Sequence, residues 1–289
     1  QDAYRQYGIT CMESGKYEDA VKAFQNALGE SIGHIGEKEL DICFYKAKAQ
    51  VLDGKTKDAL ATYNAIIKYN KDARAYYLRG DLYMDMGEEK KGRADFESAV
   101  QQGKKNYEIY IGIYESLSRH EKKDEGQKYL SAAMEIKGDK PEDELYKGRI
   151  SYLLGENKDA ISYLEKAKEH KQMLASYYLG LAYDANGDSD KAKKCIAEYI
   201  KSGVATSYDL YELGMQEMQD GNYKNALTYF NSGLELEKVP NKQNLMKSAI
   251  AAYEYSGDFD SAKKMMKEYL KAYPDDEEAK HENTFLETR

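Results

Sequence analysis

The feature that most constrains this chain is a pair of amphipathic helical segments that recurs about every 34 residues. Its clearest copy spans residues 207–240, with a turn at Gly221. Apolar residues recur at helical spacing on both sides of that turn, and a glycine between them is typical of a helix end. The small Gly214 lets the two backbones approach closely, while Leu213 and Phe230 fill the space beside it. Neither helix buries its apolar face alone, so the unit needs copies of itself.

Eight copies of this pattern follow one another along the chain. A glycine marks the turn in every copy except the fourth, which has Glu121. A small residue stands at the twentieth place of all eight copies, and a bulky residue follows four places later. The pattern predicts eight helix–turn–helix repeats and a C-terminal capping helix over 277–289, the repeats being 1–30, 40–72, 73–106, 107–140, 141–172, 173–206, 207–242 and 243–276.

This pattern resembles the tetratricopeptide repeat family, whose unit is a helix–turn–helix of 34 residues. The resemblance covers residues 1–276 and implies an all-α fold, a right-handed α-solenoid (superhelix) of such repeats. It departs from the family where no tryptophan is present and where the usual proline near the repeat end survives clearly only as Pro274. The fourth repeat is the most degenerate. All three prolines fall at repeat edges, which agrees with an all-helical chain.

Composition narrows the classes of function. No apolar run approaches the roughly 20 residues of a transmembrane helix, so we expect a soluble, acidic protein. A net charge of −8 argues against a nucleic-acid partner, because proteins that bind nucleic acid carry a concentrated basic face. Three scattered cysteines are too few for a disulfide framework or a zinc site. Because the chain begins at Gln1 rather than Met, we expect that a tag or leader preceded it; both a cytoplasmic and an extracytoplasmic (lipoprotein or secreted) location stay open.

Two segments lie outside the regular pattern. Residues 31–39 carry the extra length between the first two repeats, and their glycines predict an exposed loop with an apolar tip at Ile35. This loop is interpreted as a tolerated insertion, with contact to a partner as the alternative. In the capping helix, Ala279, Phe285 and Leu286 are expected to point inward.

Catalytic motifs are missing from the sequence. The four histidines, His34, His120, His170 and His281, have no partner at metal-ligand spacing. There is no GxSxG motif, no P-loop and no glycine-rich phosphate fingerprint. We therefore expect no enzyme, no cofactor and no metal site.

The family resemblance places ligands on the face formed by the second, fifth, ninth and twelfth places of each first helix, which lines the concave side of the superhelix. At those places tyrosine offers contact area, and arginine or lysine offers a partner for a carboxylate. The candidate binding residues are Phe44, Lys48, Tyr77, Asp81, Met84, Arg149, Tyr152, Tyr177, Leu181, Tyr208, Tyr211, Met215 and Lys247. The alternative interpretation is that many of the 28 tyrosines cover helix–helix seams.

The sequence thus predicts a non-enzymatic scaffold that binds a peptide or protein segment in its concave groove. Two alternatives stay open: a domain that senses a peptide signal for a regulator, and a purely structural spacer. The lysines and asparagines with which chaperone-binding members of the family hold a carboxylate are not matched, since Arg5, Ile9, Tyr45 and Lys48 stand at those places. We expect no chaperone-tail specificity; the partner and the oligomeric state are not predicted.

Overall fold

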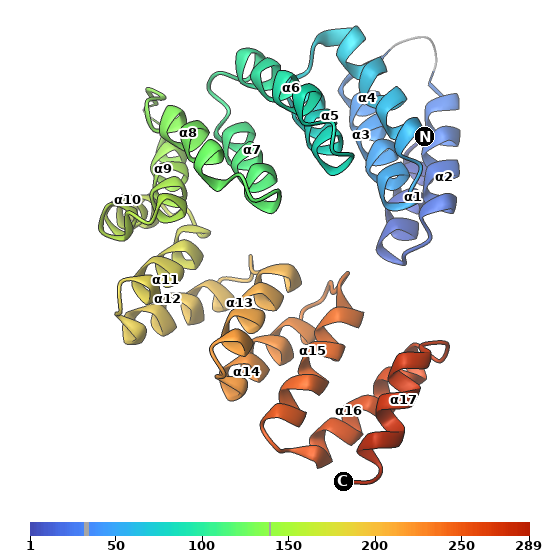
Figure 1. The fold of residues 1–289 in the computed structure, drawn as a ribbon, viewed down its shortest axis with the longest axis vertical. Helices are drawn as coiled ribbons and strands as arrows, with labels where there is room; N and C mark the ends of the chain where they lie inside the picture. The colour runs from blue at the N-terminus through green and yellow to red at the C-terminus, as the bar shows by residue number, and fades with distance from the viewer. Residues whose placement is uncertain (32–34, 139) are drawn as a thin grey trace. The chain divides into compact units, whose positions relative to one another are not determined.

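The computed structural model describes residues 1–31, 35–138 and 140–289, which form 17 α-helices and no strand (Figure 1). The all-α prediction is confirmed. The helices group into two compact units, residues 1–201 and 202–289. Seventeen helices fit eight pairs and one terminal helix, while the count of eight repeats stays a prediction.

Unit 1 contains twelve helices, which pack in chain order: α1 (Asp2–Glu13), α2 (Tyr17–Gly29), α3 (Glu37–Leu52), α4 (Thr56–Asn70), α5 (Ala73–Asp85), α6 (Glu89–Gln102), α7 (Tyr107–Arg119), α8 (Lys123–Met134), α9 (Pro141–Leu154), α10 (Asn157–Glu169), α11 (Ala175–Ala185) and α12 (Ser189–Lys201). First helices of neighbouring pairs also touch, as α5 and α7 do. The helices α3 and α5 are joined through α4, which packs against both.

Unit 2 contains α13 (Ser207–Gln219), α14 (Tyr223–Leu234), α15 (Lys242–Tyr255), α16 (Phe259–Ala272) and α17 (Glu277–Leu286). Each helix packs against the next, and α13 also contacts α15.

In the part of the chain that the structure describes, no helix has the length and apolarity that crossing a membrane requires.

The turn inside each pair depends on a left-handed residue. Gly221 has a φ of +74° there, and the other six predicted turn glycines are also left-handed. At the one exception, Glu121 adopts the same conformation with a φ of +60°. A side chain is unfavourable in this region, so the fourth turn is strained where the other seven are relaxed.

A glycine of the first helix meets a bulky side chain of the second in most pairs. A Cβ built on Gly8 would lie 2.6 Å from Cε1 of Phe24, and one built on Gly80 would lie 2.9 Å from Cδ1 of Phe96. The same contact recurs at Gly214, whose added Cβ would overlap the ring of Phe230. The predicted small and bulky columns are therefore the two sides of one contact.

The fourth pair departs from this arrangement on its first helix. Tyr114 occupies the place where six of the other first helices carry a small residue, and Gly126 faces it from α8. A Cβ on Gly126 would lie 3.0 Å from Cδ2 of Tyr114. The second helix keeps the common pattern, with the small Gly126 followed four places later by the buried Leu130, and the ring of Tyr114 packs against the backbone of α8 at Gly126.

The terminal helix α17 closes the apolar end of unit 2. Ala279 and Leu286 are buried against α15 and α16, in a cluster with Met266 and Tyr269. Phe285 is 43% exposed, so the prediction that it points inward was wrong. It directly precedes Leu286 on the helix, and adjacent residues lie about 100° apart, so both do not face the same side.

The predicted loop over residues 31–39 ends earlier than expected, because α3 (Glu37–Leu52) already includes its last three residues. Residues 32–34, with His34, lie outside the described residues. Ile35 is exposed, and its carbonyl oxygen accepts a hydrogen bond of 2.8 Å from the hydroxyl of Tyr69 in α4.

Candidate functional site

A cavity of about 540 Å³ lies between α3 and α5 in unit 1, with one residue of α4 in its wall. It is called the α3/α5 cavity below, and it is lined by Asp41, Phe44, Tyr45, Lys48, Val51, Leu52, Tyr63, Arg74, Leu78, Asp81, Leu82 and Asp85. Because successive first helices present the same face, residues from two repeats converge here. The cavity has the size of a small-molecule or side-chain pocket.

The floor of the cavity is apolar. Phe44, Tyr63 and Leu82 are buried in one cluster with residues of α3, α4 and α5. Burial raises the pKa of Tyr63 to about 12, so its hydroxyl stays protonated at neutral pH. Leu52 stands exposed at the end of α3.

The acidic residues of the cavity have cationic or imidazole partners. Asp41 accepts hydrogen bonds of 2.8 and 2.5 Å from the guanidinium of Arg5. Asp81 accepts one of 2.6 Å from Arg119. The bond to Asp41 helps to raise the pKa of Arg5, as expected for a hydrogen-bonded ion pair.

The basic residues of the cavity are in a different situation. The guanidinium of Arg74 lies over the ring of Phe44, 4.4 Å from its centroid. Among residues 1–31, 35–138 and 140–289, neither Arg74 nor the exposed Lys48 makes an ion pair. Lys48 and Arg74 are therefore the positive charges of this cavity that have no counter-ion among the described residues.

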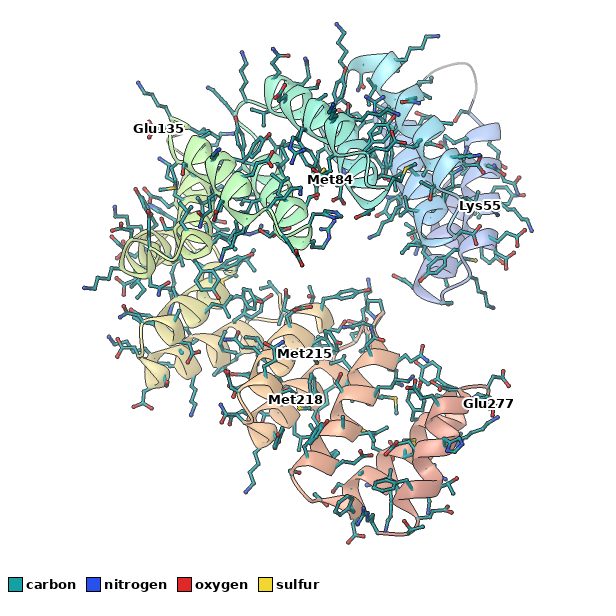
Figure 2. All side chains as sticks on the ribbon, viewed as in Figure 1. Lys55, Met84, Glu135, Met215, Met218 and Glu277 are labelled. Carbon is teal, nitrogen blue, oxygen red and sulfur yellow. The ribbon has the colours of Figure 1, made fainter. Side chains whose placement is uncertain are left out.

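The structure divides the thirteen predicted binding residues between the units. Nine lie in unit 1 and the last four, from Tyr208 onward, in unit 2. Three of them, Phe44, Lys48 and Asp81, line the α3/α5 cavity. Met84 is only 2% exposed and belongs to the core, contrary to the expectation that it lies on an open face (Figure 2).

Three predicted tyrosines pack against neighbouring helices. The rings of Tyr77, Tyr177 and Tyr211 lie 6.4, 5.3 and 6.2 Å from the ring centroids of Phe96, Tyr199 and Phe230. A Cβ on Gly112 of α7 would lie 2.6 Å from Cζ of Tyr77, so this ring also fills the seam to the next pair. These three residues follow the seam-covering interpretation.

The other predicted residues of unit 1 are half-buried. Arg149 makes ion pairs of 3.3 Å with Glu108 and 3.0 Å with Glu115, so its charge is already balanced. Tyr152 packs against the cluster around α9 to α12, and Leu181 is half-buried on α11.

In unit 2, Tyr208 is 56% exposed, while Met215 lies half-buried and packs against the core of α13 to α15 (Figure 2). Lys247 makes an ion pair of 2.9 Å with Asp276. It also lines a smaller cavity of about 270 Å³ formed by α15, α16 and α17.

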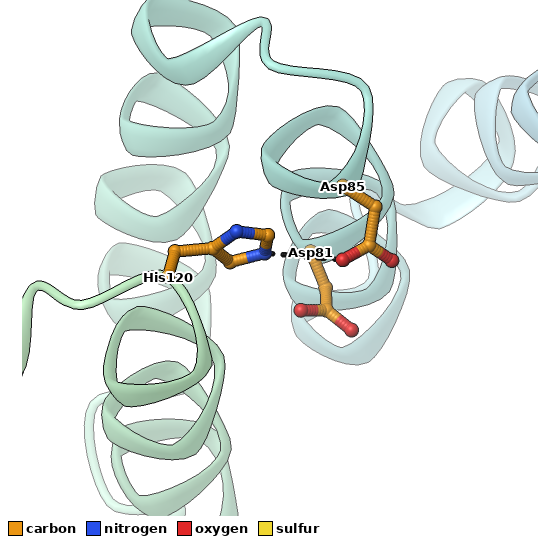
Figure 3. A group of neighbouring side chains, drawn as sticks. All are labelled: Asp81, Asp85 and His120. Carbon is orange, nitrogen blue, oxygen red and sulfur yellow. Dashed lines mark hydrogen bonds and ion pairs between the residues drawn. The ribbon is translucent and has the colours of Figure 1, made fainter.

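One cluster was missed by the sequence analysis. Asp81 and Asp85 of α5 and His120, directly after α7, bring three possible ligand atoms within 4.8 Å of one another (Figure 3). The Nε2 atom of His120 lies 3.0 Å from a carboxylate oxygen of Asp85. In sequence His120 has no partner nearby, because its neighbours come from the preceding repeat. Aligning the repeats and pairing first helices would have shown it.

Comparison with known families matched tetratricopeptide repeats to residues 46–107, and again to 174–202 and 243–276. A search of curated proteins found no match. Among solved structures, a tetratricopeptide repeat protein from Parabacteroides merdae is similar with a TM-score of 0.51 and 12% identity, covering 87% of this chain and 98% of that one. The Cut9–Hcn1 hetero-tetramer of APC/C is similar with a TM-score of 0.48 and 16% identity, covering 97% of this chain and 54% of that one.

The repeated helix pairs, the left-handed turns and these matches agree. The fold is that of a tetratricopeptide-repeat solenoid. The chain thus contains tetratricopeptide repeats in residues 46–107, 174–202 and 243–276, a repeat of the kind that serves as a scaffold for protein–protein interaction.

Proposed function

We propose that this protein is a non-enzymatic scaffold that holds an extended peptide or protein segment in the α3/α5 cavity. The observation that carries the proposal is a pair of basic side chains above an apolar floor, Lys48 and Arg74, which make no ion pair with any residue that the structure describes. A partner's acidic side chain offers the missing counter-charge, and an adjacent apolar side chain covers the floor.

The two cations differ in how they would act. Arg74 is already held over the ring of Phe44, so its planar donors are oriented before a ligand arrives. Lys48 is exposed and unconstrained, and contributes a mobile point charge. Together they favour a segment in which an acidic residue stands next to an apolar one. Because Asp41 and Asp81 already accept hydrogen bonds from arginines, a basic segment gains little from these two acids.

The test starts from peptides selected from a random phage-displayed library against the full chain. Affinities of the selected peptides are measured by fluorescence anisotropy with the parent protein and with Lys48→Glu. We expect Lys48→Glu to weaken binding by about tenfold or more, which corresponds to roughly 1.4 kcal/mol. Replacing the acidic residue of the peptide by its amide is expected to have a similar effect.

Lys57→Glu is the matched control. Lys57 is an exposed lysine on α4 that does not line the cavity, so the same charge reversal leaves the binding surface intact. Circular dichroism checks that both variants keep the parent's helicity. If both reversals weaken binding equally, the effect is one of net charge and the cavity is not the site. If no peptide is selected, the spacer alternative is favoured.

A further inference from the structure

A three-residue cluster lies at the edge of the α3/α5 cavity, on the side of α7 (Figure 3). Asp81 and Asp85 are one helical turn apart on α5, so their carboxylates extend from the same side of the helix. His120 caps the C-terminal end of α7, where its backbone N–H is held by the carbonyls of the last turn. In the described residues this is the one group of three such side chains that come together.

The cluster carries an excess of negative charge. Two carboxylates four residues apart repel each other, and Asp85 also ends α5, where the helix dipole disfavours an anion. Arg119 supplies one positive charge, 2.6 Å from Asp81 and 3.9 Å from Asp85. Two carboxylates thus face one guanidinium, which leaves one of their negative charges without an arginine partner. A further cation therefore lowers the electrostatic energy of the cluster.

We propose that Asp81, Asp85 and His120 bind a divalent transition-metal ion, with one carboxylate oxygen from each aspartate and Nε2 of the imidazole as ligands. An imidazole ligand favours Zn²⁺, Co²⁺ or Ni²⁺ over Ca²⁺ and Mg²⁺, which prefer oxygen. Ligand atoms about 2.0–2.2 Å from Zn²⁺ lie at most about 4.4 Å apart. The three ligand atoms already lie within 4.8 Å of one another, so small side-chain rotations are enough to reach that geometry. Water completes the coordination.

Arg119 competes with the metal for Asp81. Its side chain is 52% exposed, so it swings into water without leaving a buried cavity. The geometry thus makes an unusual prediction, because removing a basic residue that touches one ligand should strengthen metal binding rather than leave it unchanged.

The experiment uses the full chain after treatment with a chelator, without any peptide. Co²⁺ is titrated and followed by its visible absorption, and Zn²⁺ is titrated by calorimetry. We expect one equivalent to bind saturably. His120→Gln and Asp85→Asn should each weaken binding at least tenfold, and Arg119→Gln should strengthen it severalfold. His170→Gln, at an exposed histidine that directly follows α10, should bind as the parent does.

The variants distinguish a built site from general metal binding. A gain of affinity in Arg119→Gln cannot arise from misfolding, which protects the test against an unstable His120 variant. The proposal is overturned if the parent shows no saturable binding. It is equally overturned if the His120 and Asp85 variants bind as tightly as the parent. The result does not depend on whether the α3/α5 cavity binds a peptide.

Discussion

At the level of single residues, the helix pairs are defined by close contacts between a glycine and a bulky side chain. Gly214 and Phe230 show why both columns recur together, because the ring occupies the space that a Cβ would take. The sequence pattern was enough to predict the small residue and its location. It did not show that Phe230, the bulky residue four places after Ala226, is the residue that Gly214 contacts.

Gly214→Ala should destabilise unit 2 by about 1–3 kcal/mol, because the added methyl forces the buried ring of Phe230 to move. Urea unfolding followed by circular dichroism measures the change. Gly29→Ala is the control, since a Cβ at this exposed position at the end of α2 meets nothing within 4 Å. It should be neutral or slightly stabilising. Equal losses in both variants would contradict a steric cause.

Glu121→Gly should stabilise the fold by about 1 kcal/mol, because glycine adopts the left-handed conformation of this turn without a steric penalty. Glu135→Gly provides the contrast. Glu135 ends α8 with a φ of −76°, so a glycine there only adds freedom to the unfolded chain and should destabilise. Thermal unfolding of the two variants should therefore shift in opposite directions, and a shift in the same direction would refute the strain at Glu121.

At the level of elements, α17 is held by two buried residues, of which Leu286 is the larger, and by one N-cap. Leu286→Ala should destabilise unit 2 by about 2–5 kcal/mol, since Leu286 is 0% exposed within the last cluster. The neighbouring Phe285→Ala should cost far less. Denaturant unfolding of the two variants decides whether the face of α17 is assigned correctly, and a larger loss for Phe285→Ala would reverse that assignment.

Because of its N-cap residue Asp276, the stability of α17 is expected to depend on pH in the acidic range. A hydrogen bond from the Tyr269 hydroxyl, with others from Lys247 and the Ala279 N–H, holds the pKa of Asp276 well below its usual range. Its contribution is present above the ordinary aspartate pKa of about 4 and is lost as the pH falls toward the folded value. As the pH falls below about 4, the free energy of unfolding of Asp276→Asn should therefore decrease less steeply than that of the parent. An unchanged slope in acid unfolding would exclude this role.

Helices and turns were predictable from the sequence because each depends on residues within one repeat. The orientation of side chains on the first helices was less predictable. By helical period, Tyr77 and Met84 both belong to the face that was expected to be open. In the structure, Tyr77 is covered by the next helix pair, and Met84 is buried in the core beside Gly92, which leaves room for its side chain. The helical period predicts on which side of the helix a side chain lies, but packing against neighbouring helices determines whether that side is exposed to solvent.

At the level of the whole molecule, stability should be local, because each repeat contacts only its neighbours. Hydrogen exchange measured by mass spectrometry tests this in Gly214→Ala. Amides of α13 to α15 should exchange faster than in the parent, while those of α3 to α7 keep the parent's rates. Uniform acceleration along the chain would show that the molecule unfolds as one cooperative unit.

The pairing of charged side chains at the candidate sites also depends on contacts between repeats. Lys48, Asp81 and His120 were visible in the sequence, but the partners of Asp81 and His120 come from other repeats. Only the fold shows that Asp81 is paired with Arg119 while Lys48 has no ion pair in the described residues. The useful ligand chemistry of a repeat protein is therefore set between repeats and is not written in any one of them.

The close contact between Tyr114 and Gly126 limits how this chain can be recombined. Most other second helices carry alanine where α8 has Gly126. Exchanging α8 alone for one of them would place a methyl group about 3.0 Å from the ring of Tyr114. The helices α7 and α8 are therefore transplanted together, so the module for shuffling or redesign is the helix hairpin with its own interior, and not the single helix.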